Sequence, residues 1–414
     1  MKILLIHDYG TATGGAELQI LALRKNLRDR GHDVRLFSSR SSLVPGSPVL
    51  ADYTCFGTTS ISLQFLTNTA NLSAYFSLRR VLQEFKPDIV HIRMFLWQLS
   101  PLILPLLKDI PCLYQTAVYK AICPVGTKLL PNGTACHYQP GKACLQNSCL
   151  EVPATWPVFM LQQQLWQRWR NAIDLVVTLS HAMKSIFETA GIAPIEVVHN
   201  GVPARTMRPS LRNPPTVAYA GRLVAEKGVD ILLKAFAQVY IQIPEARLVI
   251  AGQGMAQQNL QALATELGIG DRIVWLGHLP RQAMEEYFDA AWVQVVPSLW
   301  AEPFGNVTTE AMMRGTAAIA SNVGAQPEII RDGETGFLVP PNDVNALTTA
   351  LLRLLLNADL AEKMGHAGRD RALNYFSENR CTEQFLEIYQ RLIAYNTHPH
   401  SRTAKTGHIA KTIS

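Results

Sequence analysis

The feature of this sequence that most constrains its fold is a regular alternation of short apolar segments with longer segments of helical period. The strand-length segments of the first half are residues 2–6, 34–38, 88–92, 111–115, 175–179 and 196–199. Helical patterns, such as the one at residues 15–30, lie between them. Continuous apolar strands that alternate with helices are typical of parallel sheets covered on both faces. We therefore predict an α/β fold.

A break in this alternation divides the chain of 414 residues in two. Asn200-Gly201-Val202-Pro203 has the composition of a turn, and residues 208–215 have that of a linker. The strand-length segments of the second half are residues 216–220, 247–251, 272–276, 292–296 and 317–320. We predict two doubly wound, Rossmann-like domains, residues 1–205 and 206–375, since one ordinary core rarely reaches this length. Such domains bind ligands in a cleft at the carboxyl ends of their strands.

Composition and charge narrow the function. The chain is 48% hydrophobic and 17% charged, with a net charge of +6, which suits a folded protein that binds anions. No cluster of basic and aromatic residues points to nucleic acid as a partner. The apolar stretches fall short of the roughly 20 residues that span a bilayer, and the N-terminal segment does not match a signal peptide. We expect a cytoplasmic protein.

The segment with the most specific chemistry follows the expected strand 292–296 and leads into a helix near Asn306. Its sequence places Glu302 in the loop and Glu310 about one turn into the helix. The free N–H groups of a helix start favour anionic groups, and a carboxylate can accept hydrogen bonds from two neighbouring sugar hydroxyls. Two glutamates alone would also fit a solvated helix start, where acidic residues are common.

A second segment, Gly221 to Gly228, also joins a strand to a helix and contains Arg222 and Lys227. Cations in this place could hold a diphosphate and stabilise the charge that develops when a sugar bond breaks. Catalysis would then require no metal cofactor, and the sequence has no Asp-x-Asp pair to hold one. A surface turn with a Glu226–Lys227 pair is the plainer alternative.

Seven segments, in this order, resemble the retaining glycosyltransferase family 4, which has the two-domain GT-B fold. They are Gly14-Gly15-Ala16-Glu17, Asp88-Ile89-Val90-His91, Val198-His199-Asn200-Gly201-Val202, the Arg222/Lys227 segment, Gly252-Gln253-Gly254, the Glu302/Glu310 segment and Asp332-Gly333-Glu334-Thr335-Gly336-Phe337-Leu338-Val339. The resemblance covers nearly the whole chain and is specific because the segments keep the family's order.

The resemblance implies a role for each position. Arg222, Lys227 and Glu302 would form the catalytic group, with the two cations on the diphosphate and Glu302 on the donor sugar. Gly14, Gly15, Gly252, Gly254, Phe304, Gly305, Asn306 and Glu310 would bind the donor, with Glu310 on the ribose and the glycines close to phosphate, acceptor or base.

The resemblance also places the end of the chain. The final helix, 376–395, would cross back to complete the N-terminal, acceptor-binding domain. Residues 396–414 have little apolar content, and we expect them to be disordered.

One position departs from the family pattern. Many relatives have a histidine six residues before a Cys-Pro pair, and here Ala117 stands six residues before Cys123-Pro124. If that imidazole is essential, the protein would be a catalytically impaired, donor-binding scaffold of a glycan-assembly complex. If it only positions substrate, Thr116 or Tyr119 could replace it.

Four of the seven cysteines lie close together: Cys123, Cys136, Cys144 and Cys149. Four thiolates could hold a structural zinc ion, although paired C-x2–4-C knuckles are absent. Disulfide pairing and plain reduced cysteines are the alternatives, and the sequence does not decide among the three.

A segment rich in tryptophan and arginine, residues 156–170, leaves peripheral contact with the inner face of a membrane open. Trp156, Trp166 and Trp169 together with Arg168 suit a membrane interface or a lipid-linked acceptor. The same aromatic residues fit one buried face of a helix. The predicted function is transfer of a sugar from a nucleotide sugar to an acceptor hydroxyl, in the synthesis of a polysaccharide, lipid-linked glycan or glycolipid; a synthase or phosphorylase using a sugar phosphate is the rival.

Overall fold

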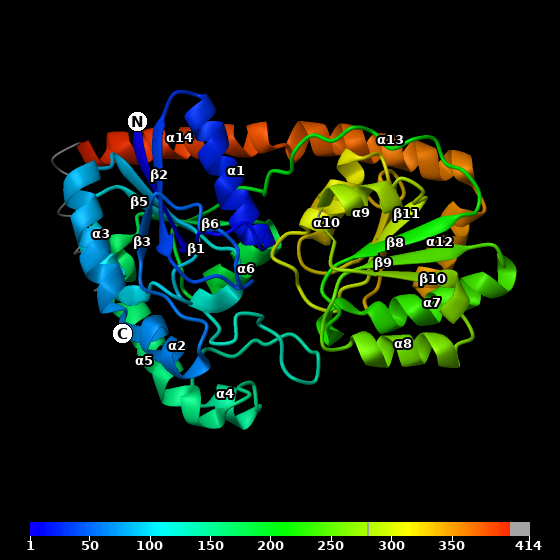
Figure 1. The fold of residues 1–414 in the computed structure, drawn as a ribbon, viewed down its shortest axis with the longest axis horizontal. Coiled ribbons are helices and arrows are strands. Elements are labelled where there is room, and N and C mark those ends of the chain that lie inside the picture. The colour runs from blue at the N-terminus through cyan, green and yellow to red at the C-terminus, as the bar shows by residue number, and fades with distance from the viewer. Residues whose placement is uncertain (280, 398–414) are drawn as a thin grey trace.

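Two parallel sheets with helices packed on them form the two halves of the molecule (Figure 1). The computed structural model describes residues 1–279 and 281–397. The first sheet has the strand order β3-β2-β1-β4-β5-β6-β7, and the second has the order β10-β9-β8-β11-β12-β13. Neighbouring strands run parallel in both sheets. The predicted α/β class, with two doubly wound domains, is confirmed.

The strands lie close to the predicted positions. Those of the first sheet are β1 (Lys2–Tyr9), β2 (Asp33–Ser39), β3 (Tyr53–Cys55), β4 (Ile89–Ile92), β5 (Cys112–Gln115), β6 (Leu175–Thr178) and β7 (Ile195–Val197). Those of the second are β8 (Thr216–Ala220), β9 (Arg247–Ala251), β10 (Ile273–Gly277), β11 (Val293–Val296), β12 (Ala317–Ser321) and β13 (Gly336–Val339). The domain boundary predicted after residue 205 falls between β7 and β8.

Helices connect these strands and cover both sheets. Those of the first half are α1 (Gly15–Asp29), α2 (Ile61–Ala70), α3 (Leu72–Phe85), α4 (Ala143–Gln146), α5 (Trp156–Trp169) and α6 (His181–Thr189). Those of the second half are α7 (Val229–Gln242), α8 (Gln257–Glu266), α9 (Arg281–Phe288), α10 (Asn306–Met313), α11 (Gln326–Ile329), α12 (Val344–Leu355) and α13 (Ala358–Tyr375). The last helix, α14 (Glu378–Thr397), follows the second half in sequence and packs on the first half.

Alternation of side chains along β1 builds a core on each face of the first sheet. Ile3 and Leu5 pack into one core with α1 and α14, whereas Leu4 and Ile6 pack into the other with α3. On α1 the buried residues Ile20, Leu23 and Leu27 recur every three or four positions, which gives the helix one apolar face.

The chain crosses between the two halves twice, and the two crossings touch. The backbone N–H of Val202 donates to the carbonyl of Phe376 at 2.8 Å, where the outgoing and returning segments meet. Figure 1 shows α14 lying along the first half as the continuation of α13. Because α14 reaches residue 397, residues 396 and 397 are helical rather than part of the expected tail; the rest of that tail, 398–414, lies outside the described residues.

The segment predicted to be a linker is anchored rather than free. Arg208 is buried, and its guanidinium lies 3.0 Å from the carboxylate of Glu362 on α13. The backbone N–H of Arg208 also donates to the carbonyl of Arg314. These bonds fix the start of the second half to α13 and to the end of α10.

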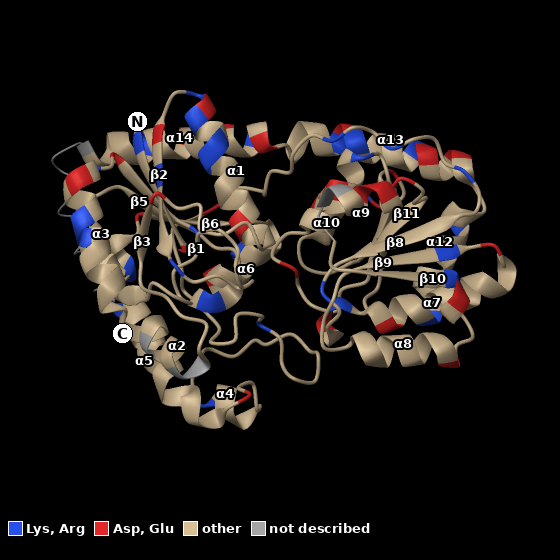
Figure 2. Cartoon of the chain, in the orientation of Figure 1, with Lys and Arg blue, Asp and Glu red and all other residues tan. Residues whose placement is uncertain are grey.

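The distribution of charge and apolar residues bears on membrane contact. Lys and Arg are spread over both halves of the molecule (Figure 2). Among the described residues, no single helix is long and apolar enough to span a membrane; α12 and α13 reach that length and composition only together, with a bend of 100° between them. Much of α12 is packed in the second core. On α5, Trp166 is buried at 1% exposure and Trp169 packs beside it, which favours core packing for these two tryptophans.

Candidate functional site

The predicted site residues lie where the winding of each sheet reverses direction. The reversal falls between β1 and β4 in the first sheet and between β8 and β11 in the second. Gly14 follows β1, Arg222 follows β8, and Glu302 follows β11. Ligands of doubly wound sheets bind at this point, outside the carboxyl ends of the strands.

A cavity of about 610 Å³ lies between the two halves. From the first half it is lined by the loop at Gly14 and Gly15 and by the start of α1. From the second it is lined by Tyr219, Ala220, Gly221, Arg222, Lys227, Val296, Ser298, Glu302, Asn306, Val307 and Glu310. Its size suits a nucleotide sugar, since ligand sites typically measure about 300–1,000 Å³.

Lys227 and Glu302 form an ion pair on the wall of this cavity. The ammonium lies 2.7 Å from Oε1 of Glu302, and the side chains are 17% and 11% exposed. The Ser298 hydroxyl donates a short hydrogen bond to the same oxygen. The indole ring of Trp300 lies 5.6 Å from the ammonium. The pair is thus fixed from several sides while it still faces the cavity.

Close packing of backbone fixes the two loops that carry this pair. Gly228 adopts a positive φ of 62°, and a Cβ atom there would lie 2.1 Å from the carbonyl oxygen of Pro297. The backbone N–H of Leu299 donates to the carbonyl of Glu226. Lys227 and Glu302 therefore meet because their loops pack directly on each other.

Arg222 and Glu310 also line the cavity. Arg222 is 65% exposed and lies 3.4 Å from the carboxylate of Glu226, so its side chain is available to an anion. Glu310 stands on α10, and Asn306 at the start of the same helix lines the cavity as well.

Two of the predicted glycines bring the opposite wall close. A Cβ atom on Gly14 would lie 2.3 Å from Oε2 of Glu17. Any larger residue at this position would therefore displace the Glu17 carboxylate. A Cβ atom on Gly15 would lie 3.5 Å from Nδ2 of Asn306 in the other half. The two domains therefore approach within contact distance at this point.

Four predicted donor-binding residues do not line the cavity: Gly252, Gly254, Phe304 and Gly305. A Cβ atom on Gly252 would lie 1.8 Å from the carbonyl oxygen of Gly221, and one on Gly254 would lie 2.2 Å from that of Leu223. These two glycines hold the loop of Arg222 in place, and their approach to a base stays a prediction.

Phe304 and Gly305 likewise take part in the packing of the loop between β11 and α10. The ring of Phe304 is buried, with its centroid 5.8 Å from that of Phe376. Gly305 adopts a positive φ of 151°, and a Cβ atom there would lie 2.6 Å from Nε2 of Gln326. The predicted contact of their backbone with a sugar or phosphate stays a prediction.

A chain of buried hydrogen bonds, which the sequence did not reveal, runs from the first half to Asn306. Arg93 donates to Oε1 of Gln115 at 2.6 Å and to Oδ1 of Asn200 at 3.1 Å. Asn200 in turn donates to Oδ1 of Asn306 at 3.0 Å. Burial lowers the pKa of Arg93 to about 10. Arg93 comes directly after β4 (Ile89–Ile92), and a charged residue at the end of an apolar strand was the available signal.

Ala117 lies in the loop that follows β5 and is not among the residues that line the cavity. Two residues further on, Tyr119 is buried, and its hydroxyl donates to the carbonyl of Ala301 at 3.0 Å. Thr116 is also buried. The loop thus contacts the residue before Glu302 through Tyr119.

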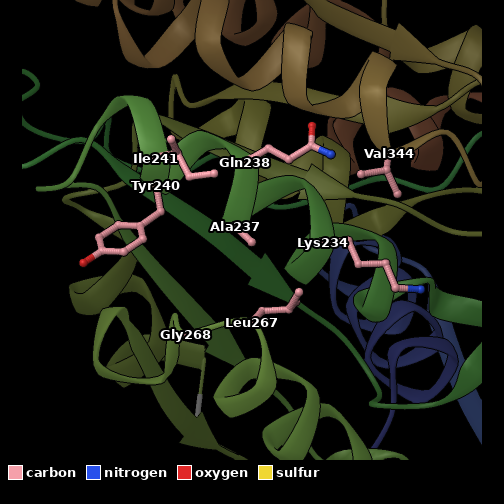
Figure 3. A pocket seen from close by; sticks show the side chains of 8 residues that line it. All are labelled: Lys234, Ala237, Gln238, Tyr240, Ile241, Leu267, Gly268 and Val344. Atoms are coloured by element: carbon pink, nitrogen blue, oxygen red, sulfur yellow. The ribbon is translucent and has the colours of Figure 1, made fainter.

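A hollow of similar size, about 640 Å³, lies elsewhere on the second half (Figure 3). Most of its lining comes from α7, including Lys234, Tyr240 and Ile241, and Leu267, Gly268 and Val344 complete it. None of the predicted site residues takes part. We place the functional site in the cleft between the halves because the glycine loops and the ion pair converge there.

Comparison with protein families covers most of the chain. Residues 14–201 match the model "Glycosyl transferase 4-like domain", and residues 205–371 match "Glycosyl transferases group 1". A GDP-mannose-dependent phosphatidylinositol monomannoside mannosyltransferase of Mycolicibacterium smegmatis is 30% identical over 53% of this chain and 63% of its own length. A D-inositol 3-phosphate glycosyltransferase of Mycobacterium avium is 37% identical over 49% of this chain and 50% of its own length. The chain thus matches about half to two thirds of the length of these curated relatives.

Solved structures resemble the whole described fold. Sucrose-phosphate synthase from Thermosynechococcus elongatus has a TM-score of 0.73 at 23% identity, covering 95% of this chain and 99% of that one. HepE from Anabaena has a TM-score of 0.69 at 20% identity, covering 94% and 100%. These likenesses show the GT-B fold. The two family models, which together match residues 14–201 and 205–371, establish that the chain belongs to glycosyltransferase family 4, the glycosyl transferases group 1.

Proposed function

We propose that this protein transfers a sugar from a nucleoside diphosphate sugar to an acceptor hydroxyl group, with retention of the anomeric configuration. The observation that carries the proposal is the Lys227–Glu302 pair on one wall of a cleft whose other wall contains Gly14 and Gly15. Cation, carboxylate and glycine loop are the groups needed for a diphosphate, a sugar and an approaching acceptor.

Lys227 and Arg222 would bind the diphosphate. Both line the same cavity, and each is currently paired with a glutamate, Glu302 and Glu226. As the bond from sugar to phosphate breaks, negative charge grows on the diphosphate, and two cations already in place stabilise it without reorganisation. We therefore propose that transfer proceeds without a metal cofactor, and that it continues in the presence of a chelator.

Glu302 and Glu310 would select the sugar and the ribose. A carboxylate oxygen fixed by Lys227 and Ser298 leaves the second oxygen of Glu302 to accept from sugar hydroxyls. This fixed arrangement suits binding better than attack on the anomeric carbon. We accordingly place the attack of the acceptor on the face from which the diphosphate leaves, which retains the configuration.

Relatives support the donor class and suggest the product. HepE structures contain UDP or UDP-glucose, and the mannosyltransferase relative is named for GDP-mannose. The name of the same mannosyltransferase also includes phosphatidylinositol monomannoside, and another relative is named for D-inositol 3-phosphate. We propose a polysaccharide, lipid-linked glycan or glycolipid as the product of this protein. The catalytically impaired scaffold rests on Ala117 alone, and Ala117 does not line the cavity that contains Arg222, Lys227, Glu302 and Glu310.

The experiment begins with a thermal-shift screen of UDP, GDP and ADP sugars, because a donor that binds only the folded state raises its apparent stability. Transfer and hydrolysis of the stabilising donor are then compared between the wild type, Lys227→Ala and Glu302→Gln. We expect each variant to lose about 10²-fold or more in kcat/KM, the usual loss when a group that stabilises transition-state charge is removed.

Lys234→Ala is the matched control. Lys234 is a lysine of the same domain, lies in the other hollow (Figure 3), and is 44% exposed beside Asp230. It should keep full activity. Equal residual rates in the wild type, Lys227→Ala and Glu302→Gln would reject the proposal.

A further inference from the structure

Cys123, Cys136, Cys144 and Cys149 all line one small cavity at the edge of the first half, although they are well separated in sequence. The cavity measures about 20 Å³, and its other lining is mostly apolar, with Ile122, Pro124, Val125 and Leu129 among its members. That volume has room for about one water-sized particle and none for a sugar or a base. A single ion is therefore the kind of ligand that fits.

Two short structures bring the cysteines together. A tight hairpin follows Cys123: Leu129 pairs antiparallel with Ala135, and the N–H of Cys136 donates to the carbonyl of Lys128 at 2.8 Å. The helical turn α4 carries Cys144, and the N–H of Cys149 donates to the carbonyl of Cys144 at 3.0 Å. Cys123 and Cys136 thus flank the hairpin, whereas Cys144 lies in α4 and Cys149 just after it.

The thiols are close enough to affect one another. Cys123, Cys136 and Cys144 all lie near enough to Cys149 to interact with it electrostatically. Thiolates in such a group repel one another unless a cation lies between them.

A buried lysine beside the cluster is a second, independent observation. Lys120 is 1% exposed, and its ammonium lies 4.0 Å from the ring of Trp97 and 4.4 Å from the ring of Phe159. It donates to the carbonyl of Pro124. Within the described residues no carboxylate pairs with it. Burial lowers the pKa of Lys120 to about 7, while Cys123 and then Asp8 favour its charged form. An anionic centre at the cysteines would compensate this buried charge.

We propose that Cys123, Cys136, Cys144 and Cys149 bind one zinc ion as four thiolates. Zinc binds four thiolates in tetrahedral geometry at about 2.3 Å. Four thiolates with one Zn²⁺ have a net negative charge, which would favour the charged form of the nearby Lys120. In the described part of the chain, no group of three or more histidine, cysteine or acidic side chains is placed to hold a metal ion as it stands. Under this proposal, binding of the ion would therefore draw the hairpin and α4 inward onto the cavity.

The ion would support the acceptor side of the cleft. Cys123 closes the loop that contains Tyr119, whose hydroxyl contacts the carbonyl of Ala301 beside Glu302. A metal bound by Cys123 would also restrain the loop after β5. This loop contains Tyr119 and Ala117, the residue at the position of the family's histidine. This role is structural and does not depend on the identity of the donor.

The test measures metal in the full-length protein, purified under reducing conditions from cells grown without added zinc. We expect close to one zinc per chain by mass spectrometry of the metal. We also expect that replacement by Co²⁺ gives the visible absorption of a tetrahedral tetrathiolate site. Cys136→Ser and Cys144→Ser should each lose most of the zinc, because three thiolates bind it much more weakly.

Cys55→Ala and Cys381→Ala are the matched controls, because these cysteines lie in the first half outside the cluster, and both should retain the zinc. Wild-type protein that is folded and free of zinc would overturn the proposal, whether peptide mapping then finds the four cysteines as disulfides or as free thiols. Iron with inorganic sulfide in place of zinc would overturn it as well. Donor binding is measured separately, so failure here leaves the transferase proposal standing.

Discussion

Arg93 shows how a single residue can connect the two halves of the site. Its guanidinium is buried and donates hydrogen bonds to Gln115 and Asn200. Asn200 in turn donates a hydrogen bond to Asn306, the first residue of α10. A planar guanidinium can serve two acceptors at fixed angles, which an ammonium cannot do. We infer that Arg93 positions Asn306 rather than contacting the donor.

Replacing Arg93 with methionine should therefore weaken donor binding more than it slows the chemical step. We expect the KM for the donor to rise about tenfold, roughly 1.4 kcal/mol, with a smaller change in kcat. Arg93→Lys keeps the charge but not the bridge and should give an intermediate KM. A folded Arg93→Met protein whose KM is unchanged would contradict the role.

At the scale of elements, glycines determine how closely the loops after β8 and β9 pack on each other. The loop after β8 exchanges hydrogen bonds with the loop after β9: the N–H of Leu223 donates to the carbonyl of Gln253, and the N–H of Ala256 donates to the carbonyl of Leu223. A Cβ atom on Gly254 would lie 2.2 Å from the carbonyl oxygen of Leu223, which is backbone and cannot turn aside.

We predict that Gly254→Ala lowers both stability and donor affinity, because Leu223 must move and Arg222 moves with it. The loss of stability should be about 1–3 kcal/mol, the usual cost of overpacking, measured by urea unfolding. Gly270→Ala is the control: its Cβ atom would have 4.0 Å to Thr265, and its φ is not positive. That variant should be neutral or slightly stabilising. Equal effects of the two substitutions would refute the packing argument.

The start of α6 depends on a carboxylate from the other half of the molecule. Glu328 on α11 accepts from the backbone N–H groups of His181 and Ala182 at 2.9 and 2.8 Å, and His199 lies 3.2 Å away. Burial alone would raise the pKa of Glu328. The bonds from His199, His181 and Ala182 outweigh burial and hold the pKa below its ordinary value of 4.5.

This depressed pKa predicts the pH dependence of stability. The unfolded chain takes up the proton first, so the contribution of Glu328 is complete above about pH 4.5 and is lost as pH falls through the lower folded value. Glu328→Gln should cost about 1 kcal/mol near neutral pH, as for the loss of a helix cap. The difference between the two proteins in urea unfolding should shrink below pH 4.5. A difference that stays constant down to pH 3 would exclude the mechanism.

Most elements could be predicted from the sequence because their periodicity is local. β8 (Thr216–Ala220) and β9 (Arg247–Ala251) have the predicted bounds. The sequence missed β3 because Tyr53–Cys55 has only three residues and lacks an apolar run. It assigned Gly336–Val339 to a family motif without identifying β13. Such short strands exist because a neighbouring strand pairs with them, β2 and β12 respectively, and this pairing is not written in their own residues.

At the scale of the whole molecule, what the sequence could not supply was the pairing of distant groups. It identified Lys227 and Glu302 separately, but not their bond across 75 positions or the Ser298 contact beside it. Gly14, Gly15, Asn306 and Glu310 share the cleft as expected, whereas Gly252, Gly254, Phe304 and Gly305 pack behind it. Patterns of residue type reveal which loops face a cleft. They do not reveal which members face inward, because that depends on the partner loop.

The return of the chain makes the first domain depend on residues that follow the second. Phe385 and Tyr389 of α14 are buried in the core formed with Ile3 and Leu5 of β1. The Tyr389 hydroxyl lies 2.6 Å from Nδ1 of His91, and the ring of Phe385 lies 4.8 Å from that imidazole. Burial, followed by the charge of Arg93, lowers the pKa of His91 to about 3. The imidazole is therefore a neutral member of this core.

Phe385→Ala should therefore destabilise the N-terminal domain by about 3–5 kcal/mol, since the cavity opens inside that core. Leu356→Ala, at a position 67% exposed, should cost little. Tryptophan fluorescence cannot separate the domains, because both contain tryptophan, so hydrogen exchange of β1 and β8 amides is the measurement. Faster exchange in β1 with β8 unchanged would place α14 within the first folding unit. Equal acceleration in both strands would mean that the two domains unfold as one body, with α14 coupling them instead of completing either.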